Sequence, residues 1–289
     1  MAKKIFIMIF TVAALLRLPI FAEQVKDMFE TYNFVPTYMS SFTTELSQDF
    51  SYNPGDYPTS IFFAIGDKLS QDIDLGLKEY LGLEVEVKIY KLEDKIRDEF
   101  FPYYEKESLR GVAVFYNEDL VGLWCVDTKA MFSVTGRNLF YIDFADSKWK
   151  KFLVKNKIFK KTARDKELRQ LSPRGLIKEM MLGVKEKNLE KFYSCFTRQY
   201  VFKKLYSDFL DNYSLNHNFG KKIFVGDLNN IKNIEIKEMN SLSLTGADIA
   251  VYQVIFEIQG IDGSIKNKRF VVLLKKEIKN LGWRIEEIK

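Results

Sequence analysis

The sequence predicts an α+β protein of two domains, in which the C-terminal domain is a curved antiparallel sheet wrapped around helices that precede it, a cone-like arrangement. Three observations lead to this prediction. A helical apolar period runs from Ser172 to Tyr206, a strand period of two follows from Asn229, and the net charge changes sharply along the chain. We therefore expect a first domain at residues 23–146, a basic linker or last element of that domain at 147–170, and the cone-like domain at 171–289.

The helical stretch predicts two consecutive amphipathic helices. Ser172 is a suitable N-cap, and Pro173 falls at the first helical position, where a missing N–H costs nothing. Asn188 is expected to cap the second helix, with Gly183 and the polar residues 185–188 forming the joint between the two. Apolar residues recur at helical spacing in both: Ile177, Met180, Met181 and Val184, then Leu189, Phe192, Tyr193 and Phe196.

Four strands are predicted after these helices, at residues 229–239, 248–260, 266–278 and 283–288. In the second of them a mostly apolar face alternates with a mixed one, and the chain turns at Gly260–Gly263. The mostly apolar face comprises Ala250, Tyr252, Val254, Phe256 and Ile258.

The first domain begins with residues 23–57, which are rich in Ser, Thr, Tyr and Asn and predict loops with a short helix at 25–32. The later elements show clearer periodicity. They are a helix at 61–69, a strand at 83–90 with Val85, Val87 and Ile89 inward, a hairpin at 110–124 turning at Asn117–Asp119, and weaker strands at 132–134 and 139–144.

The C-terminal elements together resemble a known fold. The segments MLGVKEKNLEKFYSCFTRQY, NIKNIEIKEM, VYQVIFEIQG, FVVLLKKEI and GWRIEEI follow the order of the cone-shaped nuclear-transport-factor-2-like, or ketosteroid-isomerase-like, fold over roughly residues 170–289. They look more narrowly like domains of unknown function in exported proteins of clostridial-type bacteria. The segment YNPGDYPTSIFFAIGDKLSQDIDLGLKEYLGLEVEVKIYKL is similar to an N-terminal region of the same proteins. The superfamily includes isomerases, dehydratases and non-catalytic ligand or partner domains, so the resemblance implies a fold and leaves the chemistry open.

Residues 1–22 have the pattern of an export signal. Lys3 and Lys4 precede an apolar run at 5–16, and Pro19 and Ala22 supply a break and a cleavage site. The alternative is an uncleaved membrane anchor at residues 5–21. Either form predicts an extracytoplasmic protein, secreted or held at the membrane.

Charge is unevenly distributed along the chain. Three of the 44 basic residues lie in the signal, which leaves 41 against 39 acidic residues, a net charge of +2. The predicted segments carry −12 at 23–146, +8 at 147–170 and +6 at 171–289. A nearly neutral mature chain gives no reason to expect nucleic acid as a partner.

No catalytic, metal or cofactor site is predicted from motifs. The single histidine, His217, cannot form a histidine-rich metal site. Asp72 and Asp74 have the opening spacing of a calcium loop but lack its later ligands. Cys125 and Cys195 fall one in each predicted domain, and are either a disulfide or two buried thiols.

The basic segment suggests contact with an anionic cell-wall or lipid surface, because its lysines alternate with apolar residues. In the alternative, it is a regular element whose lysines face water. The residues concerned are Lys148, Trp149, Lys150, Lys151, Lys155, Lys157, Lys160 and Lys161.

The aromatic content of 15% suggests that part of the cone interior lines a pocket. The expected lining is Tyr193, Phe196, Tyr200, Phe209, Tyr213, Tyr252, Phe256 and Phe270. The sequence thus predicts a non-catalytic binding or interaction module for a small apolar ligand or a protein partner. One alternative is an isomerase or dehydratase with a Tyr donor and a carboxylate base, for which Glu257 and Glu277 are the nearby acids. A structural protein of the wall or membrane surface is another.

Overall fold

The structure is a computed structural model. It describes residues 24–50, 59–94, 108–142, 146–155, 162–212, 222–245, 248–276 and 281–289. The expected signal or anchor at 1–22 lies outside these residues. Within the described part of the chain, no helix is both long enough and apolar enough to cross a membrane.

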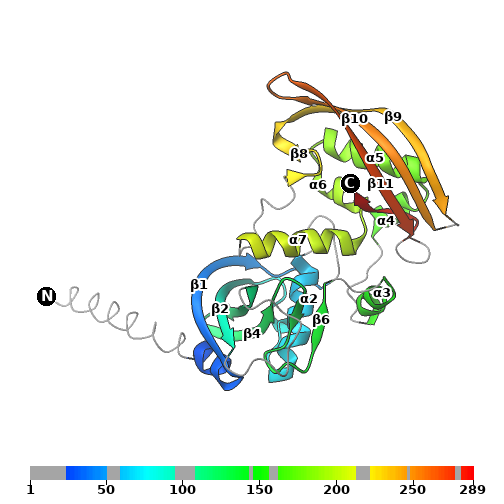
Figure 1. The fold of residues 1–289 in the computed structure, drawn as a ribbon. Helices are drawn as coiled ribbons and strands as arrows, with labels where there is room; N and C mark the ends of the chain where they lie inside the picture. Colours follow the sequence, from blue (N-terminus) through cyan, green and yellow to red (C-terminus); the bar gives the residue numbers. More distant parts are fainter. Residues whose placement is uncertain are drawn as a thin grey trace. The chain divides into compact units, whose positions relative to one another are not determined.

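The chain divides into two compact units (Figure 1). The first lies within Met1–Asp49 and Phe63–Asp143, and the second within Phe50–Phe62 and Phe144–Lys289. The described residues form helices and two larger antiparallel sheets, one of six strands and one of four. The predicted α+β class is therefore confirmed.

The first unit is organised by the six-stranded sheet, in which every strand pairs with its neighbours in chain order. A helix at residues 24–31 comes before the sheet. The strands are β1 (Phe34–Glu45), β2 (Glu84–Asp94), β3 (Arg110–Tyr116), β4 (Asp119–Val126), β5 (Ala130–Phe132) and β6 (Leu139–Tyr141).

The predicted strand and hairpin of this unit are confirmed. Val85, Val87 and Ile89 of β2 are all buried, as their alternation predicts. Tyr116 pairs with Asp119 across a two-residue turn whose residues have φ of 47° and 76°. Such left-handed turns match the twist of the paired strands, which explains why the hairpin forms there.

The helix α2 (Thr59–Ser70) contacts β4 through small residues. A Cβ added at Gly66 would lie 2.7 Å from the Trp124 ring, so only glycine allows this approach. The Ser70 hydroxyl accepts a hydrogen bond from the Leu123 N–H at 2.9 Å. Two short 3-10 turns, η2 (Gln71–Ile73) and η3 (Lys78–Tyr80), lie between α2 and β2.

The expectation of loops over residues 23–57 is wrong for Phe34–Glu45, which form β1. In the described part of the chain this strand is at the edge of the sheet, paired with β2. From Met39 to Glu45 exposed and half-buried residues alternate, and an edge strand tolerates Pro36 because one row of its backbone groups needs no partner strand. The composition of this segment predicted a loop, whereas backbone pairing with β2 makes it a strand.

Among the described residues of the second unit, five helices lie between residue 146 and the four-stranded sheet. They are α3 (Asp146–Lys155), α4 (Ala163–Leu168), α5 (Pro173–Lys185), α6 (Leu189–Ser194) and α7 (Arg198–Asn212). The predicted caps are confirmed. The Ser172 hydroxyl accepts from the Gly175 N–H at 3.1 Å, and the Asn188 side chain accepts from the Lys191 N–H at 2.9 Å.

The prediction of two helices between Ser172 and Tyr206 is wrong, because the chain interrupts the second. Phe196 forms a parallel bridge with Ile285, and the Thr197 N–H donates to the Ile285 carbonyl at 2.9 Å. The Thr197 hydroxyl then accepts from the Tyr200 N–H at 3.2 Å and caps a third helix, α7.

The four predicted strands are confirmed and form one antiparallel sheet in the order β12-β11-β10-β9. The mostly apolar face of the second strand is the buried one. In Figure 1 the helices α5 and α6 lie against one side of this sheet. The elements are β9 (Ile231–Thr245), β10 (Ile249–Gly260), β11 (Ile265–Lys276) and β12 (Trp283–Ile288), preceded by a small pair, β7 (Lys222–Ile223) and β8 (Gly226–Asp227), and the 3-10 turn η5 (Leu228–Asn230).

Gly183 lies inside α5 and not in a joint, since α5 continues to Lys185. A Cβ at this position would meet the Phe192 backbone nitrogen at 2.6 Å. We expect Gly183→Ala to destabilise the second unit by about 1–3 kcal/mol, because the α6 backbone must move. Urea unfolding followed by labelling of the buried Cys195 thiol measures this loss.

Gly175 provides the matched control within the same helix. A Cβ there meets side chains at 3.4–3.7 Å, ordinary contact distances. Gly175→Ala is therefore expected to be neutral or to stabilise by about 0.5–1 kcal/mol through helix propensity. Equal unfolding midpoints for the two variants would contradict the proposed close approach of α6.

Candidate functional site

A buried carboxylate, Asp165, holds three elements of the second unit together. It lies in α4 and contacts Arg198 at the start of α7 at 3.2 Å and Arg284 of β12 at 2.8 Å. Both arginines are almost fully buried. Arg284 also donates to the Leu281 and Trp283 carbonyls at 2.9 and 2.7 Å, which fixes the turn before β12.

The protonation state of Asp165 follows from this setting. Burial alone favours the neutral carboxyl, but the Arg198 and Arg284 charges and the Thr162 N–H together hold the pKa of Asp165 below its ordinary value. The Thr162 N–H donates to Asp165 at 2.9 Å in a capping box at the start of α4. Asp165 is therefore an ionised anchor for its neighbours.

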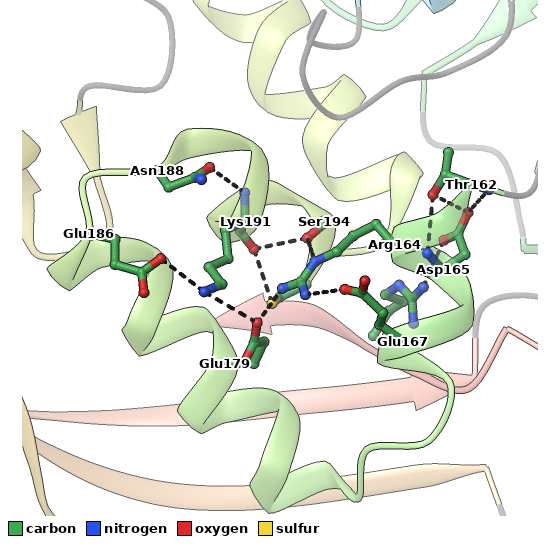
Figure 2. A network of polar contacts seen from close by, with 11 residues as sticks. Thr162, Arg164, Asp165, Glu167, Glu179, Glu186, Asn188, Lys191 and Ser194 are labelled. Carbon is green, nitrogen blue, oxygen red and sulfur yellow. Dashed lines mark hydrogen bonds and ion pairs between the residues drawn. The ribbon is translucent and has the colours of Figure 1, made fainter.

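A second polar network joins α4 to α5 and α6 (Figure 2). The Arg164 guanidinium donates to the Ser194 hydroxyl at 3.2 Å and pairs with Glu179 and, at 2.9 Å, with Glu167. Lys191 pairs with Glu186 at 2.9 Å and approaches Glu179. The basic segment is thus tied to the predicted helical pair through specific side chains.

Next to these networks, α7, β7 and β12 border an open cleft of about 730 Å³. One face of α7 is apolar and buried. The cleft side carries polar residues at helical spacing, which places them in one row along the helix. The lining residues are Tyr200, Lys203, Lys204, Ser207, Asp208 and Asp211 of α7, Ile223 of β7, and Glu286 and Glu287 of β12.

The contact between α7 and β12 positions the acidic side of the cleft. Glu286 accepts from the Thr197 hydroxyl at 2.9 Å and pairs with Lys275 of β11 at 2.9 Å. Its carboxylate is therefore held by two partners, whereas Glu287 pairs with Lys289. The lining residues include two lysines and four carboxylates, and two of the carboxylates, Glu286 and Glu287, are paired with lysines outside the lining.

Two cleft residues have shifted pKa values. Burial and the Glu287 charge raise the pKa of Tyr200, so its phenol is a neutral hydrogen-bond donor near pH 7. Burial and the nearby Asp211 raise the pKa of Asp208, against the opposing Lys204 charge. This arrangement can bind a charged small molecule.

The residues predicted to line an apolar pocket have different positions. Tyr200 lines the cleft, whereas Phe256 contacts Phe224 and Phe270 at ring distances of 5.5 and 5.8 Å. Phe270 is half-buried, and Tyr213 lies outside the described residues. The remaining members are buried in the interior: Tyr193, Phe196, Phe209 and Tyr252.

The basic segment is partly described. Its helix α3 exposes Lys148, Lys151 and Lys155, while Leu153 is buried. Trp149 and Lys150 belong to α3, but their side chains lie outside the described ones, as do Lys157, Lys160 and Lys161 altogether. The lysines described here are on a helix face open to solvent.

The other candidates are placed as follows. Cys125 and Cys195 are buried and do not form a disulfide, and burial raises the pKa of Cys195 to about 12. Asp72 accepts from Thr135 and Asn138 and so fixes a turn. Among the described residues no group of three or more His, Cys, Asp or Glu could hold a metal ion.

Two further predicted residues, His217 and Glu277, lie outside the described part of the chain. Glu257 alternates with the buried Phe256 and pairs with Lys237 at 2.8 Å. It therefore lies on the side of the sheet opposite the buried one.

The first unit has a smaller cleft of about 420 Å³ between the α2–β2 connection and β4. Asp67 contributes to it, but its carboxylate is buried and accepts from the Leu77 N–H at 2.9 Å and the Gln71 amide at 2.8 Å. Asp67 therefore mainly stabilises the loop between α2 and β2. Gly76, Leu120 and Val121 also line this cleft.

Comparison with known families bears on the first unit. Residues 28–125 match a domain of unknown function, DUF4830. The DUF4830-like segment runs from the first helix through most of β4 and contains the smaller cleft. The larger cleft of the second unit lies outside it. A search of curated proteins gave no match.

Sequence reasoning missed most of the larger cleft. A detectable signal existed in the polar residues from Tyr200 to Asp211, which recur at helical spacing. The Asp165 cluster had no such signal, because Arg198 and Arg284 are 33 and 119 residues away in sequence.

Proposed function

We propose that the protein is an extracytoplasmic, non-catalytic binding module whose second unit binds a small polar ligand carrying a positive charge. The observation that carries the proposal is the cleft of about 730 Å³ between α7 and β12, with its mixed but mainly acidic lining. The export pattern of residues 1–22 supports the location. The resemblance to the cone fold supports a ligand-binding unit.

The lining suggests how such a ligand is held. Asp208, Asp211 and Glu287 provide carboxylates for a cationic group, and Lys203 and Lys204 can contact an anionic one. Tyr200 adds a donor and an aromatic surface. The interior rings near Phe256 contact one another, so the proposal places the ligand in the polar cleft and not in an apolar cavity.

Native mass spectrometry of the protein purified from its cells tests for a retained ligand, and calorimetric titration with L-lysine and L-glutamate tests the charge preference. We expect L-lysine to bind more tightly than L-glutamate. Asp208→Asn combined with Asp211→Asn should weaken L-lysine binding roughly 10-fold or more, because two charged contacts are lost.

Glu190→Gln is the matched control, since Glu190 is an exposed acid of α6 outside the cleft. This variant should bind like the wild type. Equal affinity of the wild type and the double Asp variant for L-lysine would contradict the cleft as the binding site.

A second candidate function is an isomerase-type or dehydratase-type enzyme. It is favoured by one observation: Tyr200 and Asp208 line the same cleft, and both have raised pKa values. If it is correct, a carbon-bound proton of the co-purified ligand exchanges with D₂O in the presence of the wild type. Asp208→Asn should abolish that exchange while the ligand still binds.

A further inference from the structure

The hairpin that joins β10 and β11 exposes two large apolar side chains at its tip. Ile261 and Ile265 are 63% and 62% exposed, the highest values among the large hydrophobic residues of the described chain. In Figure 1 the hairpin extends past α5 and α6. Single exposed apolar residues are common on protein surfaces. Here two such residues flank one tight turn and together form a small exposed apolar patch.

The tip has a fixed shape. The Gly260 N–H donates to the Ser264 carbonyl at 2.8 Å, and Asp262 accepts from the Ser264 N–H and hydroxyl at 3.0 and 2.7 Å. The Ile261 N–H donates to the Asn230 carbonyl at 3.0 Å, which ties the turn to the start of β9. The two isoleucines are therefore exposed on a structured turn and need little ordering before they bind.

Basic side chains lie directly behind the tip. Lys266, Lys268 and Arg269 follow Ile265 and are all exposed, and Lys232 is exposed on β9 next to the hairpin base. On the paired strands down to the level of Arg269, residues 230–238 and 255–269 contain five cations and four acids, a net charge of +1. Two of these acids, Glu235 and Glu257, pair with Lys237, so exposed basic side chains are the charged groups nearest the apolar tip on β11.

The spacing fits the layers of a bilayer. At about 3.3 Å per strand residue, Lys268 is about 10 Å behind Ile265. The polar layer on each side of a bilayer is roughly 5–8 Å thick. With Ile261 and Ile265 at the boundary of the acyl chains, Lys266 lies within the headgroup layer and Lys268 at its outer edge, where anionic lipids attract both side chains.

We propose that the β10–β11 hairpin is a membrane-docking element that inserts Ile261 and Ile265 into the interface of a bilayer containing anionic lipid. Lys232, Lys266, Lys268 and Arg269 contact the headgroups. The proposal is independent of the cleft, because none of these residues lines it. It differs from the contact predicted for the basic segment, because Lys148, Lys151 and Lys155 of that prediction are on α3.

The test is flotation of the purified protein with vesicles of phosphatidylcholine alone or with one third phosphatidylglycerol. We expect binding to the vesicles with phosphatidylglycerol. Ile261→Ser combined with Ile265→Ser should lower the partition coefficient roughly 10-fold or more. Lys266→Gln combined with Lys268→Gln should lower it by a similar factor at low salt and have less effect at high salt.

Leu242→Ser is the matched control. Leu242 is 53% exposed on β9 of the same sheet, near the end remote from the hairpin tip, so it should leave binding unchanged. Ile261→Trp gives a direct readout, because its fluorescence should shift to the blue with phosphatidylglycerol vesicles and be quenched by brominated acyl chains.

Three results would overturn the proposal. The first is that the wild type does not bind phosphatidylglycerol vesicles. The second is that binding depends on the lysines but not on the isoleucines, which indicates contact with an anionic surface without insertion. The third is that binding survives in the hairpin variants but is lost in Lys151→Gln combined with Lys155→Gln, which assigns it to α3.

Discussion

Asp165→Asn is expected to destabilise the second unit by about 3–5 kcal/mol. The substitution keeps the size of the side chain but leaves Arg198 and Arg284 buried without their counter-charge, and removing one partner of a buried ion pair costs about this much. Labelling of Cys195 in increasing urea measures the loss, because this thiol is buried in the same unit. Cys125 reports on the first unit and should become reactive at an unchanged urea concentration.

The same contact predicts a pH dependence. Because the pKa of Asp165 is lower in the folded state than in the unfolded chain, its stabilising contribution is complete above the unfolded value, about 3.8. It is lost as the pH falls through the folded value. The difference in stability between the wild type and Asp165→Asn should therefore be constant from pH 5 to 7 and shrink below about pH 4.

Glu167→Gln is the control for this pair of measurements. Glu167 is also in α4 and also pairs with an arginine, but its side chain is 65% exposed. Exposed pairs contribute about 0–1 kcal/mol, so this variant should unfold close to the wild type. If Asp165→Asn were equally mild, the buried carboxylate would not be the anchor of α4, α7 and β12.

Phe256→Ala is expected to destabilise the second unit by about 3–5 kcal/mol. The ring is fully buried between Phe224 and Phe270, so truncation removes its contacts and leaves a cavity. The urea midpoint for Cys195 labelling measures the effect. Ile249→Ala in the same strand is the control, because Ile249 is 42% exposed and its truncation should cost about 0.5 kcal/mol or less.

This prediction also separates two interpretations of the aromatic residues. If Phe256 lined an open apolar pocket, its truncation would enlarge that pocket and reduce ligand binding with a small effect on stability. A large loss of stability with unchanged L-lysine binding supports the polar cleft as the site. A small loss of stability with reduced L-lysine binding would instead support a binding site in the aromatic interior.

The sequence predicted features that depend on nearby residues. Ser172 and Asn188 cap helices through backbone N–H groups three residues away, and the alternation in β10 identified the buried side of that strand. The turn at Asn117 and Glu118 also depends only on residues that are close in sequence. Such features are visible in sequence because their physical cause lies within one turn or one strand.

The features that were missed depend on distant partners. The strand β1 has a weak apolar pattern and is stabilised by pairing with β2 along its length. The helical stretch is interrupted between α6 and α7 because Phe196 and Thr197 contact the backbone of Ile285, which is distant in sequence. The cleft was missed for the same reason, because two of its acids come from β12 and its row of polar residues comes from α7.

The position of β12 also has a consequence for synthesis. Arg284 completes the Asp165 cluster, and Ile285 supplies the backbone contacts that start α7, yet both follow every other element of the second unit in the chain. The first unit pairs its strands in sequence order and can assemble as they leave the ribosome. The second unit must keep Asp165 and Arg198 solvated until β12 emerges, so we expect it to be the later of the two to become resistant to protease on a translating ribosome.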